Sequence, residues 1–230
     1  MPFLTPLEAQ ALELSLRIGL VAVAGGLPVA FAFAYALARG RFPGRGLLSA
    51  VIYLPLVLPP VVTGYVLLLL FGRHGPIGAW FESWFGLVFA FRWTGAALAA
   101  AIMAMPLMVR AIQLSLEAVD EGLEQAAAGL GAPGWAVFLT VTLPLSLPGV
   151  MAGALMGFAK SLGEFGATIT FVSNIPGQTQ TLPTAIYTLL QVPGSDPAVI
   201  RLALLSVAVS GVAVLTSEIV GRRLKQRAAR

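Results

Sequence analysis

The chain has 230 residues, of which 58% are hydrophobic and 10% are charged, and its formal net charge is +4. Soluble domains carry roughly 25% charged residues, so this composition excludes an ordinary soluble protein and predicts a membrane protein. An excess of lysine and arginine in such a protein marks cytoplasmic loops rather than a surface for nucleic acid. The chain has no cysteine for disulfides or thiolate metal sites, and its single histidine, His74, cannot form a metal site alone.

Five apolar segments bounded by charged residues are candidates to cross a bilayer, which takes about 20 mostly apolar residues. The third is short and spans only if its flanking arginines snorkel. The predicted spans are Ile18–Ala38, Leu47–Phe71, Trp93–Val109, Leu143–Phe171 and Leu202–Val220. Two further segments, Trp80–Phe91 and Leu182–Val192, are short and interrupted, which favours surface or re-entrant helices over a sixth span. The sequence therefore predicts an all-α membrane protein, a polytopic bundle of five transmembrane helices with six as the alternative.

Lysine and arginine set the orientation, because cytoplasmic loops are rich in both. The loop 39–45 carries three arginines and no acidic residue, and the tail after the fifth span carries Arg222, Arg223, Lys225, Arg227 and Arg230. With five spans these segments share one side, so we expect a cytoplasmic C-terminus and an external N-terminus. The N-terminal segment lacks the basic region and cleavage site of a signal peptide. The same count places segment 113–142 in the cytoplasm and loops 72–92 and 172–201 outside, within one transmembrane domain over residues 1–230.

Prolines interrupt the second predicted span. Pro55, Pro59 and Pro60 remove backbone N–H donors, which kinks a helix and frees carbonyl groups inside the membrane. We therefore expect Pro59 and Pro60 to belong to a hinge or gate. A bend that only shapes the helix is the alternative interpretation.

The most acidic part of the chain lies between the third and fourth spans and predicts a short helix over Glu117–Leu130. Acidic residues in its opening turns favour the helix dipole, Ala126–Ala128 is a strong helix former, and Gly131 followed by Pro133 ends it. Amphipathic helices that lie on a membrane are usually basic, so an acidic helix favours docking to a cytoplasmic protein. The carboxylates are Glu117, Asp120, Glu121 and Glu124.

Small residues at fixed spacing mark the same segment. Ala126, Ala127 and Gly131, followed by Val141-x-Leu143-Pro144, match two alanines, a glycine and a later Ile-x-Leu-Pro. In this pattern the segment resembles the diagnostic loop of bacterial ABC importer permeases. The strict alignment places Gln125 where that family has a glutamate, with Glu124 one residue earlier. The resemblance implies that the loop inserts into a cleft of an ATPase subunit through Glu121, Glu124, Gln125, Ala126, Ala127, Gly131, Leu143 and Pro144.

A nucleotide-binding motif of the form G-x-x-x-x-G-K-[ST] is absent from the sequence. The resemblance therefore implies that ATP and Mg²⁺ bind to separate ATPase chains, so that this chain binds no cofactor and is not an enzyme. Five helices from one copy are few to enclose a pathway. We accordingly expect a homodimer in the bilayer, with two ATPase subunits in the cytoplasm.

Two charges lie well inside the fourth predicted span. A charged side chain at the bilayer centre costs about 2.5–3.5 kcal/mol on insertion scales, so Lys160 and Glu164 should face protein or water, and being one helical turn apart they could pair. Hydroxyl and amide donors suit an oxyanion in transit, whereas close helix packing is the alternative explanation of the glycines. The predicted pathway residues of this span are Lys160, Ser161, Gly163, Glu164, Gly166 and Thr168.

The run Ser161–Thr188 resembles the corresponding part of bacterial molybdate importer permeases, and the likeness extends over most of the chain, including Pro106–Ala111. It implies import of molybdate, or of tungstate, across the bacterial inner membrane from an extracytoplasmic binding protein. Sulfate and thiosulfate permeases share a similar Leu-Gly-Glu-aromatic-Gly stretch, so a sulfate importer is the alternative. A secondary carrier is less favoured, because the sequence has no internal repeat and few ionisable residues within spans.

Overall fold

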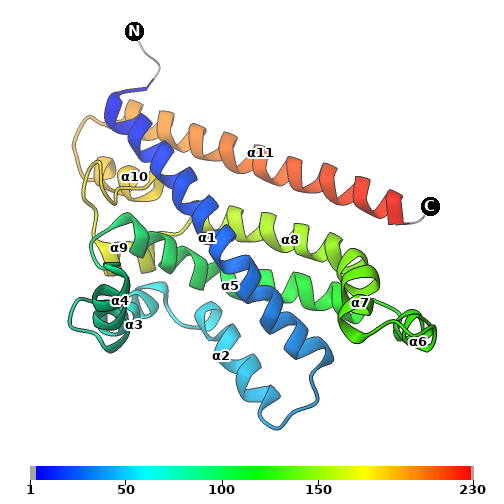
Figure 1. The fold of residues 1–230 in the computed structure, drawn as a ribbon. Helices are drawn as coiled ribbons and strands as arrows, with labels where there is room; N and C mark the ends of the chain where they lie inside the picture. The colour runs from blue at the N-terminus through cyan, green and yellow to red at the C-terminus, as the bar shows by residue number, and fades with distance from the viewer. Residues whose placement is uncertain (1–3, 229–230) are drawn as a thin grey trace.

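The computed structural model describes residues 4–228, without the side chains of residues 214 and 217–230, so the basic side chains of the C-terminal tail lie outside what it describes. Within that part the chain is helical and has no strand (Figure 1). The elements are α1 (Pro6–Arg39), α2 (Arg45–Val57), α3 (Pro60–Phe71), α4 (Pro76–Phe85), α5 (Trp93–Glu117), α6 (Glu121–Gly129), α7 (Gly134–Val137), the π-helix η1 (Phe138–Thr142), α8 (Leu143–Leu162), α9 (Gly166–Val172), α10 (Leu182–Leu190) and α11 (Asp196–Ala228).

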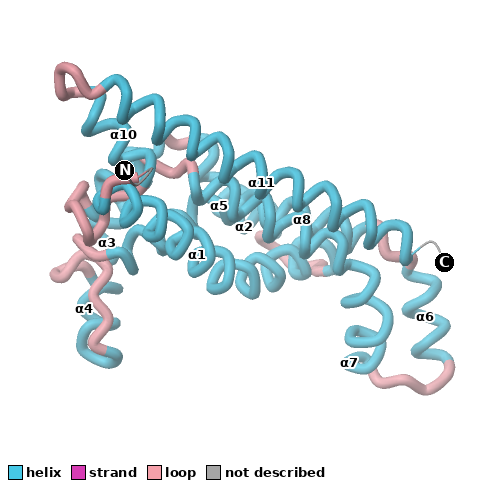
Figure 2. The backbone as a smooth tube through the Cα atoms, turned by 90° about the horizontal axis from the view of Figure 1, so that it is seen from above, coloured by secondary structure: helices cyan, strands magenta, loops and turns pink. Residues whose placement is uncertain are grey.

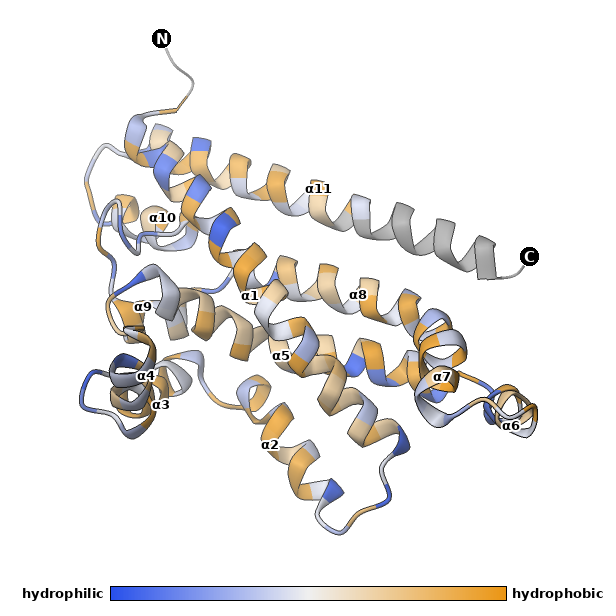
Figure 3. Ribbon diagram, in the orientation of Figure 1, coloured by the Kyte–Doolittle hydropathy of each residue, from blue (hydrophilic) through white to orange (hydrophobic). Residues whose placement is uncertain are grey.

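Helix α5 is the centre of the bundle and packs against α1 and α8. In its most apolar stretch of 18 residues, 61% of the residues are buried. The corresponding share is 28% in α1 and 28% in the continuous run from α7 through η1 to α8. Small residues allow this close approach: a methyl group added at Gly157 of α8 would lie 2.8 Å from the side chain of Met108, and one at Gly149 would lie 2.2 Å from Ser115. The outward faces of the helices remain apolar and exposed, as Figure 3 shows along α1, α2 and α8, which suits a protein surrounded by lipid and other subunits.

The span count agrees with the sequence prediction when the α2–α3 pair is taken as one span. Four helices are long and apolar enough to cross a membrane, and the pair makes a fifth. Helix α10 occupies the second short apolar segment and α4 overlaps the first half of the other, and they have 9 and 10 residues. At about 1.5 Å per residue neither reaches across a hydrocarbon core of about 30 Å.

The second predicted span has the bend that its prolines indicated, and the bend is sharp enough to divide it into two helices. The axes of α2 and α3 differ by 117°, with the break at Leu58 and Pro59. The last α2 bond runs from the Leu58 N–H to the Leu54 carbonyl, after which two prolines offer no N–H. Pro60 then begins α3 at a position where a missing donor costs nothing.

The fourth predicted span is wrong at both ends. Its helix begins at Gly134 rather than Leu143, passes through the π-helix η1, and ends at Leu162, while α9 is a separate helix. In η1 the Leu143 N–H bonds the carbonyl of Phe138, five residues back. Pro144 has no N–H for the carbonyl four residues before it, which disrupts the regular α-helical ladder at this point.

The acidic helix is shorter than predicted. It begins at Glu121 rather than Glu117, because Asp120 caps it by accepting a hydrogen bond from the Gly122 N–H at 2.8 Å, and Glu117 is the last residue of α5. Gly131, at φ +91°, follows the helix in a conformation that favours glycine, as expected. Figure 2 shows α4 and α6 projecting from opposite ends of the long helices.

Candidate functional site

One arginine joins the acidic helix α6 to the bundle. Arg39, the last residue of α1, donates from Nη1 to Glu121 Oε1 at 3.1 Å and from Nη2 to Glu124 Oε1 at 3.2 Å. Nη2 also donates to the Val119 carbonyl at 3.3 Å. The side chains of Arg39 and Glu124 are 17% and 22% exposed, so their ion pair is better shielded from water than an ordinary surface pair.

Glu124 also contacts the start of the α8 helix. The Thr142 hydroxyl, in the π-helix η1, donates to Glu124 Oε1 at 2.6 Å. This oxygen therefore accepts hydrogen bonds from both α1 and η1. A displacement of α6 would act on both helices through one carboxylate.

The remaining residues of the predicted coupling segment take no part in the hydrogen bonds among Arg39, Glu121, Glu124 and Thr142. Gln125 and Ala126 are exposed on α6, Ala127 is half-buried, and Gly131 is exposed in the turn that follows. Leu143 and Pro144 belong to the first turn of α8 rather than to α6. The exposed residues leave α6 an open surface with no buried residue of its own.

Sequence reasoning missed two apolar residues beside α6 as well as Arg39 and Thr142. Leu130 is 91% exposed and Trp135 is 70% exposed, beside the exposed surface of α6. A signal was present, since both are large apolar residues among glycines, alanines and a proline. Arg39 counts in the sequence only as one of three basic residues in loop 39–45, and no local pattern indicates its acidic partners more than 80 residues away.

The breaks in the second and fourth predicted spans bring two short helices together. A methyl group at Gly64 of α3 would lie 2.5 Å from the Ala167 carbonyl of α9, and one at Gly166 would lie 2.7 Å from Pro60. Only glycine fits such contacts without a shift of backbone. We call α3 and α9 the paired half-helices. Thr63, the neighbour of Gly64, is buried and its hydroxyl has no hydrogen-bond partner among the described residues.

Lys160 and Glu164 form the predicted ion pair. Nζ of Lys160 donates to Glu164 Oε2 at 2.8 Å, and the exposed fractions of the two side chains are 30% and 2%. The second carboxylate oxygen accepts from the Ala167 N–H at 3.1 Å. Glu164 therefore joins the end of α8 to the first turn of α9 across exposed Gly163, and its buried charge is compensated on both sides.

The predicted hydroxyl donors are not on an open surface. Ser161 is buried and donates to the Gly157 carbonyl at 2.7 Å, and Thr168 is 2% exposed. Of the predicted pathway residues, the structure brings Pro60 into contact with Gly166 and Lys160 into contact with Glu164. Pro59 is the residue before α3, at the break itself.

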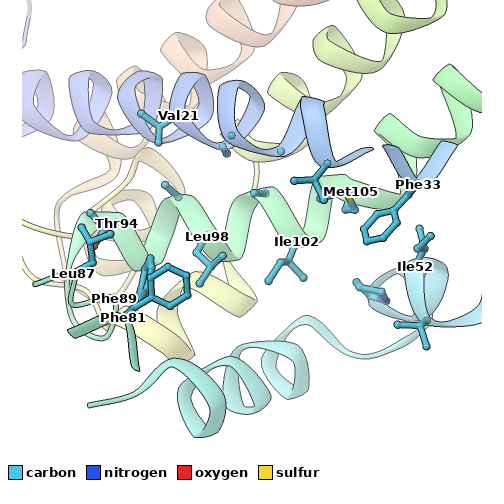
Figure 4. A pocket seen from close by; sticks show the side chains of 18 of the residues that line it. Val21, Phe33, Ile52, Phe81, Leu87, Phe89, Thr94, Leu98, Ile102 and Met105 are labelled. Carbon is cyan, nitrogen blue, oxygen red and sulfur yellow. The ribbon is translucent and has the colours of Figure 1, made fainter. Parts of the chain in front are cut away.

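A large apolar cavity of about 850 Å³ lies between α1, α2 and α5. Figure 4 shows Val21, Ile52, Leu98, Ile102 and Met105 turned toward it from these three helices. No charged side chain lines it. An ionised oxyanion in such a cavity would lose its hydration without gaining a partner, so this cavity is excluded as an oxyanion site.

The sequence profile of one protein family, described as binding-protein-dependent transport system inner membrane component, matches residues 26–226. The chain belongs to this family. It is therefore the membrane component of a transport system, in agreement with the resemblance to importer permeases that its coupling pattern predicted.

Individual members of the family agree with the finer resemblance. The chain is 56% identical over 227 residues to the molybdenum transport system permease protein ModB of Escherichia coli K12, covering 99% of each chain. It is 53% identical over 221 residues to ModB of Haemophilus influenzae, covering 96% of each. The sulfate transport system permease protein CysW of Synechococcus elongatus is 40% identical over 174 residues, covering 76% of this chain and 60% of that one. The likeness to molybdate permeases is confirmed, and the sulfate alternative has less support.

Solved structures show that the fold is that of ABC importer permeases. A bacterial ABC transporter involved in the import of alginate superposes with a TM-score of 0.75 at 18% identity, covering 96% of this chain and 81% of that one. The MetNI methionine ABC transporter superposes with a TM-score of 0.68 at 15% identity, covering 94% of each. The family fold thus persists at sequence identities where substrates differ.

Replacing Arg39 with glutamine should loosen α6. The change removes the hydrogen bonds from Arg39 to Glu121 and Glu124. Because both ion pairs are partly open to water, we expect a loss of about 1.4 kcal/mol, so that the α6 amides exchange with deuterium about tenfold faster. Hydrogen exchange followed by mass spectrometry measures this. Arg41→Gln is the matched control, because Arg41 is exposed and forms no ion pair with a described residue. Equal exchange in wild type and Arg39→Gln would show that α6 is held by other contacts.

Lys160→Ala should reduce the amount of folded protein more than the double change Lys160→Ala/Glu164→Ala. The single change leaves a buried carboxylate without its cation, at a cost of about 3–5 kcal/mol, while the double change removes both charges. Fluorescence-detected size-exclusion chromatography of detergent extracts measures the folded fraction. Equal losses in the two variants would argue against a stabilising pair.

Proposed function

We propose that the chain is the transmembrane subunit of an ATP-driven importer of molybdate, with tungstate as a second substrate. The observation that carries this proposal is the 56% identity, across 99% of the chain, to a protein named as a molybdenum transport permease. In this proposal a binding protein outside the membrane selects the oxyanion and delivers it. Two copies of the chain form the pathway, and two separate ATPase chains bind ATP and Mg²⁺.

The arrangement of the helices supports one orientation. The contact between Arg39 and α6 places the basic loop 39–45 and the acidic helix at the same end of the bundle. The opposite end holds the beginning of α1, where Glu8 pairs with Arg201 of α11. We assign the α6 end to the cytoplasm, which puts the N-terminus outside and the C-terminus inside.

A continuous series of contacts supports coupling between α6 and a gate. Closure of the ATPase chains would move α6, and Glu124 would pass the force to α1 and, through Thr142, to α8. At its far end α8 is joined to α9 through Glu164, and α9 packs directly against α3. In this account the paired half-helices, at the two span breaks, form the gate.

In this proposal Lys160 contacts the oxyanion in transit as well as forming the ion pair with Glu164. Its side chain is the more exposed of the two, at 30%, so an anion passing nearby could contact the ammonium group while it stays paired with Glu164. A cation already balanced by a carboxylate attracts an oxyanion weakly, and weak sites favour conduction over trapping. The alternative is that the pair only holds α8 and α9 together.

The proposal predicts transport by the complete assembly in proteoliposomes. With the binding protein loaded with molybdate, we expect both ATP hydrolysis and molybdate uptake to rise several-fold above the levels with empty binding protein. Hydrolysis by the colorimetric release of phosphate, and uptake by radiolabelled molybdate, measure the two rates. Ala126→Arg, which adds bulk and charge to an exposed α6 position, should abolish co-purification of the ATPase and both activities.

The other outcomes reassign the function. Stimulation by a sulfate-loaded binding protein alone would keep the importer and change its substrate. Oxyanion uptake in vesicles that lack any ATPase would make the chain a carrier. Gln191→Arg, an exposed position at the opposite end of the bundle, is the matched control for Ala126→Arg and should leave ATPase association unchanged.

A further inference from the structure

A second cavity, of about 620 Å³, lies where three loops meet at the end of the bundle opposite α6. Arg73 comes from the loop after α3, Arg92 directly precedes α5, and Gly177 and Gln178 come from the loop between α9 and α10. Unlike the apolar cavity described above, this one is lined by two arginines and a glutamine. None of these residues belongs to the predicted pathway.

The two arginines leave an excess of positive charge at this cavity. Arg92 is exposed and forms no ion pair with any described side chain. Arg73 has one acidic neighbour, with its Nε 3.8 Å from Glu82 Oε1, and both side chains are open to water at 65% and 39% exposure. A third guanidinium, of Arg17, lies 3.9 Å from the ring centroid of Trp93, which also lines the cavity.

The backbone around the cavity is held in an unusual conformation. Phe91, a bulky residue beside Arg92, has φ +58°, and Ser173, at the end of α9, has φ +66°. Residues other than glycine rarely occupy this region, and such strain persists where surrounding structure imposes it, often at ligand-binding sites. Contacts with the surrounding structure, and not the backbone preferences of Phe91 and Ser173 alone, therefore set the shape of these loops.

The cavity adjoins the paired half-helices. Helix α3 ends at Phe71, two residues before Arg73, and α9 ends at Val172, a few residues before Gly177. Two of the three loops that line the cavity are thus the direct continuations of α3 and α9. A ligand that drew these loops together would act on both half-helices.

We propose that this cavity binds a tetrahedral oxyanion, with Arg73 and Arg92 as the charged ligands and the Gln178 amide as a neutral donor. Guanidinium groups present planar pairs of N–H donors that match the oxygens of such anions, and two of them suit a doubly charged one. The proposal rests on the proposed function for its orientation, in which the cavity faces outside and receives the oxyanion released by the binding protein. The phosphate of a lipid headgroup has the same chemistry and is the second source.

Direct binding to the purified full-length chain tests the proposal without ATPase or binding protein. Equilibrium dialysis with radiolabelled molybdate or sulfate, in a phosphate-free maltoside detergent, gives the dissociation constant. Arg92→Gln should raise it about tenfold, since a hydrogen bond to a charged group is lost. Glu82→Gln should lower it, because the carboxylate that competes for Arg73 is gone. Arg41→Gln, at an exposed arginine in the loop before α2, should leave it unchanged.

Each outcome decides the proposal. No binding to the wild-type chain, or equal weakening by Arg41→Gln and Arg92→Gln, would overturn it. If Arg92→Gln does not fold, Arg73→Gln tests the same cavity from a different loop.

Repeating the dialysis in phosphatidylcholine nanodiscs distinguishes a free oxyanion from a lipid phosphate as the ligand. Retained binding of the radiolabelled anion identifies the free oxyanion, and its displacement identifies the lipid phosphate. A complete transporter that takes up molybdate normally while the chain binds no oxyanion would reject the cavity and leave the proposed function intact.

Discussion

The position of the acidic helix α6 depends on the hydrogen bonds that the Glu124 carboxylate accepts. One of its oxygens accepts a hydrogen bond from Arg39 at the end of α1 and another from Thr142 at the start of the α8 helix. Without it the acidic helix, which buries no residue of its own, would be attached to the bundle mainly by its two loops and the more exposed Glu121 pair. A short exposed helix can transmit force only if such contacts fix its position.

The small-residue packing around α5 explains why force on α6 would reach the other end of the molecule. Close contact of Met108 with Gly157, and of Ser115 with Gly149, leaves α5 and α8 little room to slide past each other. Two spans break instead, at Pro59 and at Gly163, and there the chain changes direction. Long helices that end at the paired half-helices are suited to moving a gate. The apolar cavity between α1, α2 and α5 has no charged lining residue and offers an oxyanion no path.

Much of this arrangement could be predicted from the sequence, because spans, prolines and charges are local signals. The number of apolar segments, the bend at Pro59 and the pairing of Lys160 with Glu164 all follow from spacing along the chain. The size of the bend and the start of the fourth helix at Gly134 could not, since tertiary packing decides them. The partners of Arg39 lie more than 80 residues away, so no periodicity indicates them.

The most direct test of the account is the ratio of molybdate uptake to ATP hydrolysis in proteoliposomes containing the Arg39→Gln variant. Loss of the Arg39 contacts should leave ATPase association and hydrolysis in place, because the exposed face of α6 is unchanged, while uptake per ATP falls about tenfold. The Arg41→Gln variant should keep the wild-type ratio. An unchanged ratio in Arg39→Gln would contradict the central claim that Arg39 and Glu124 carry the coupling.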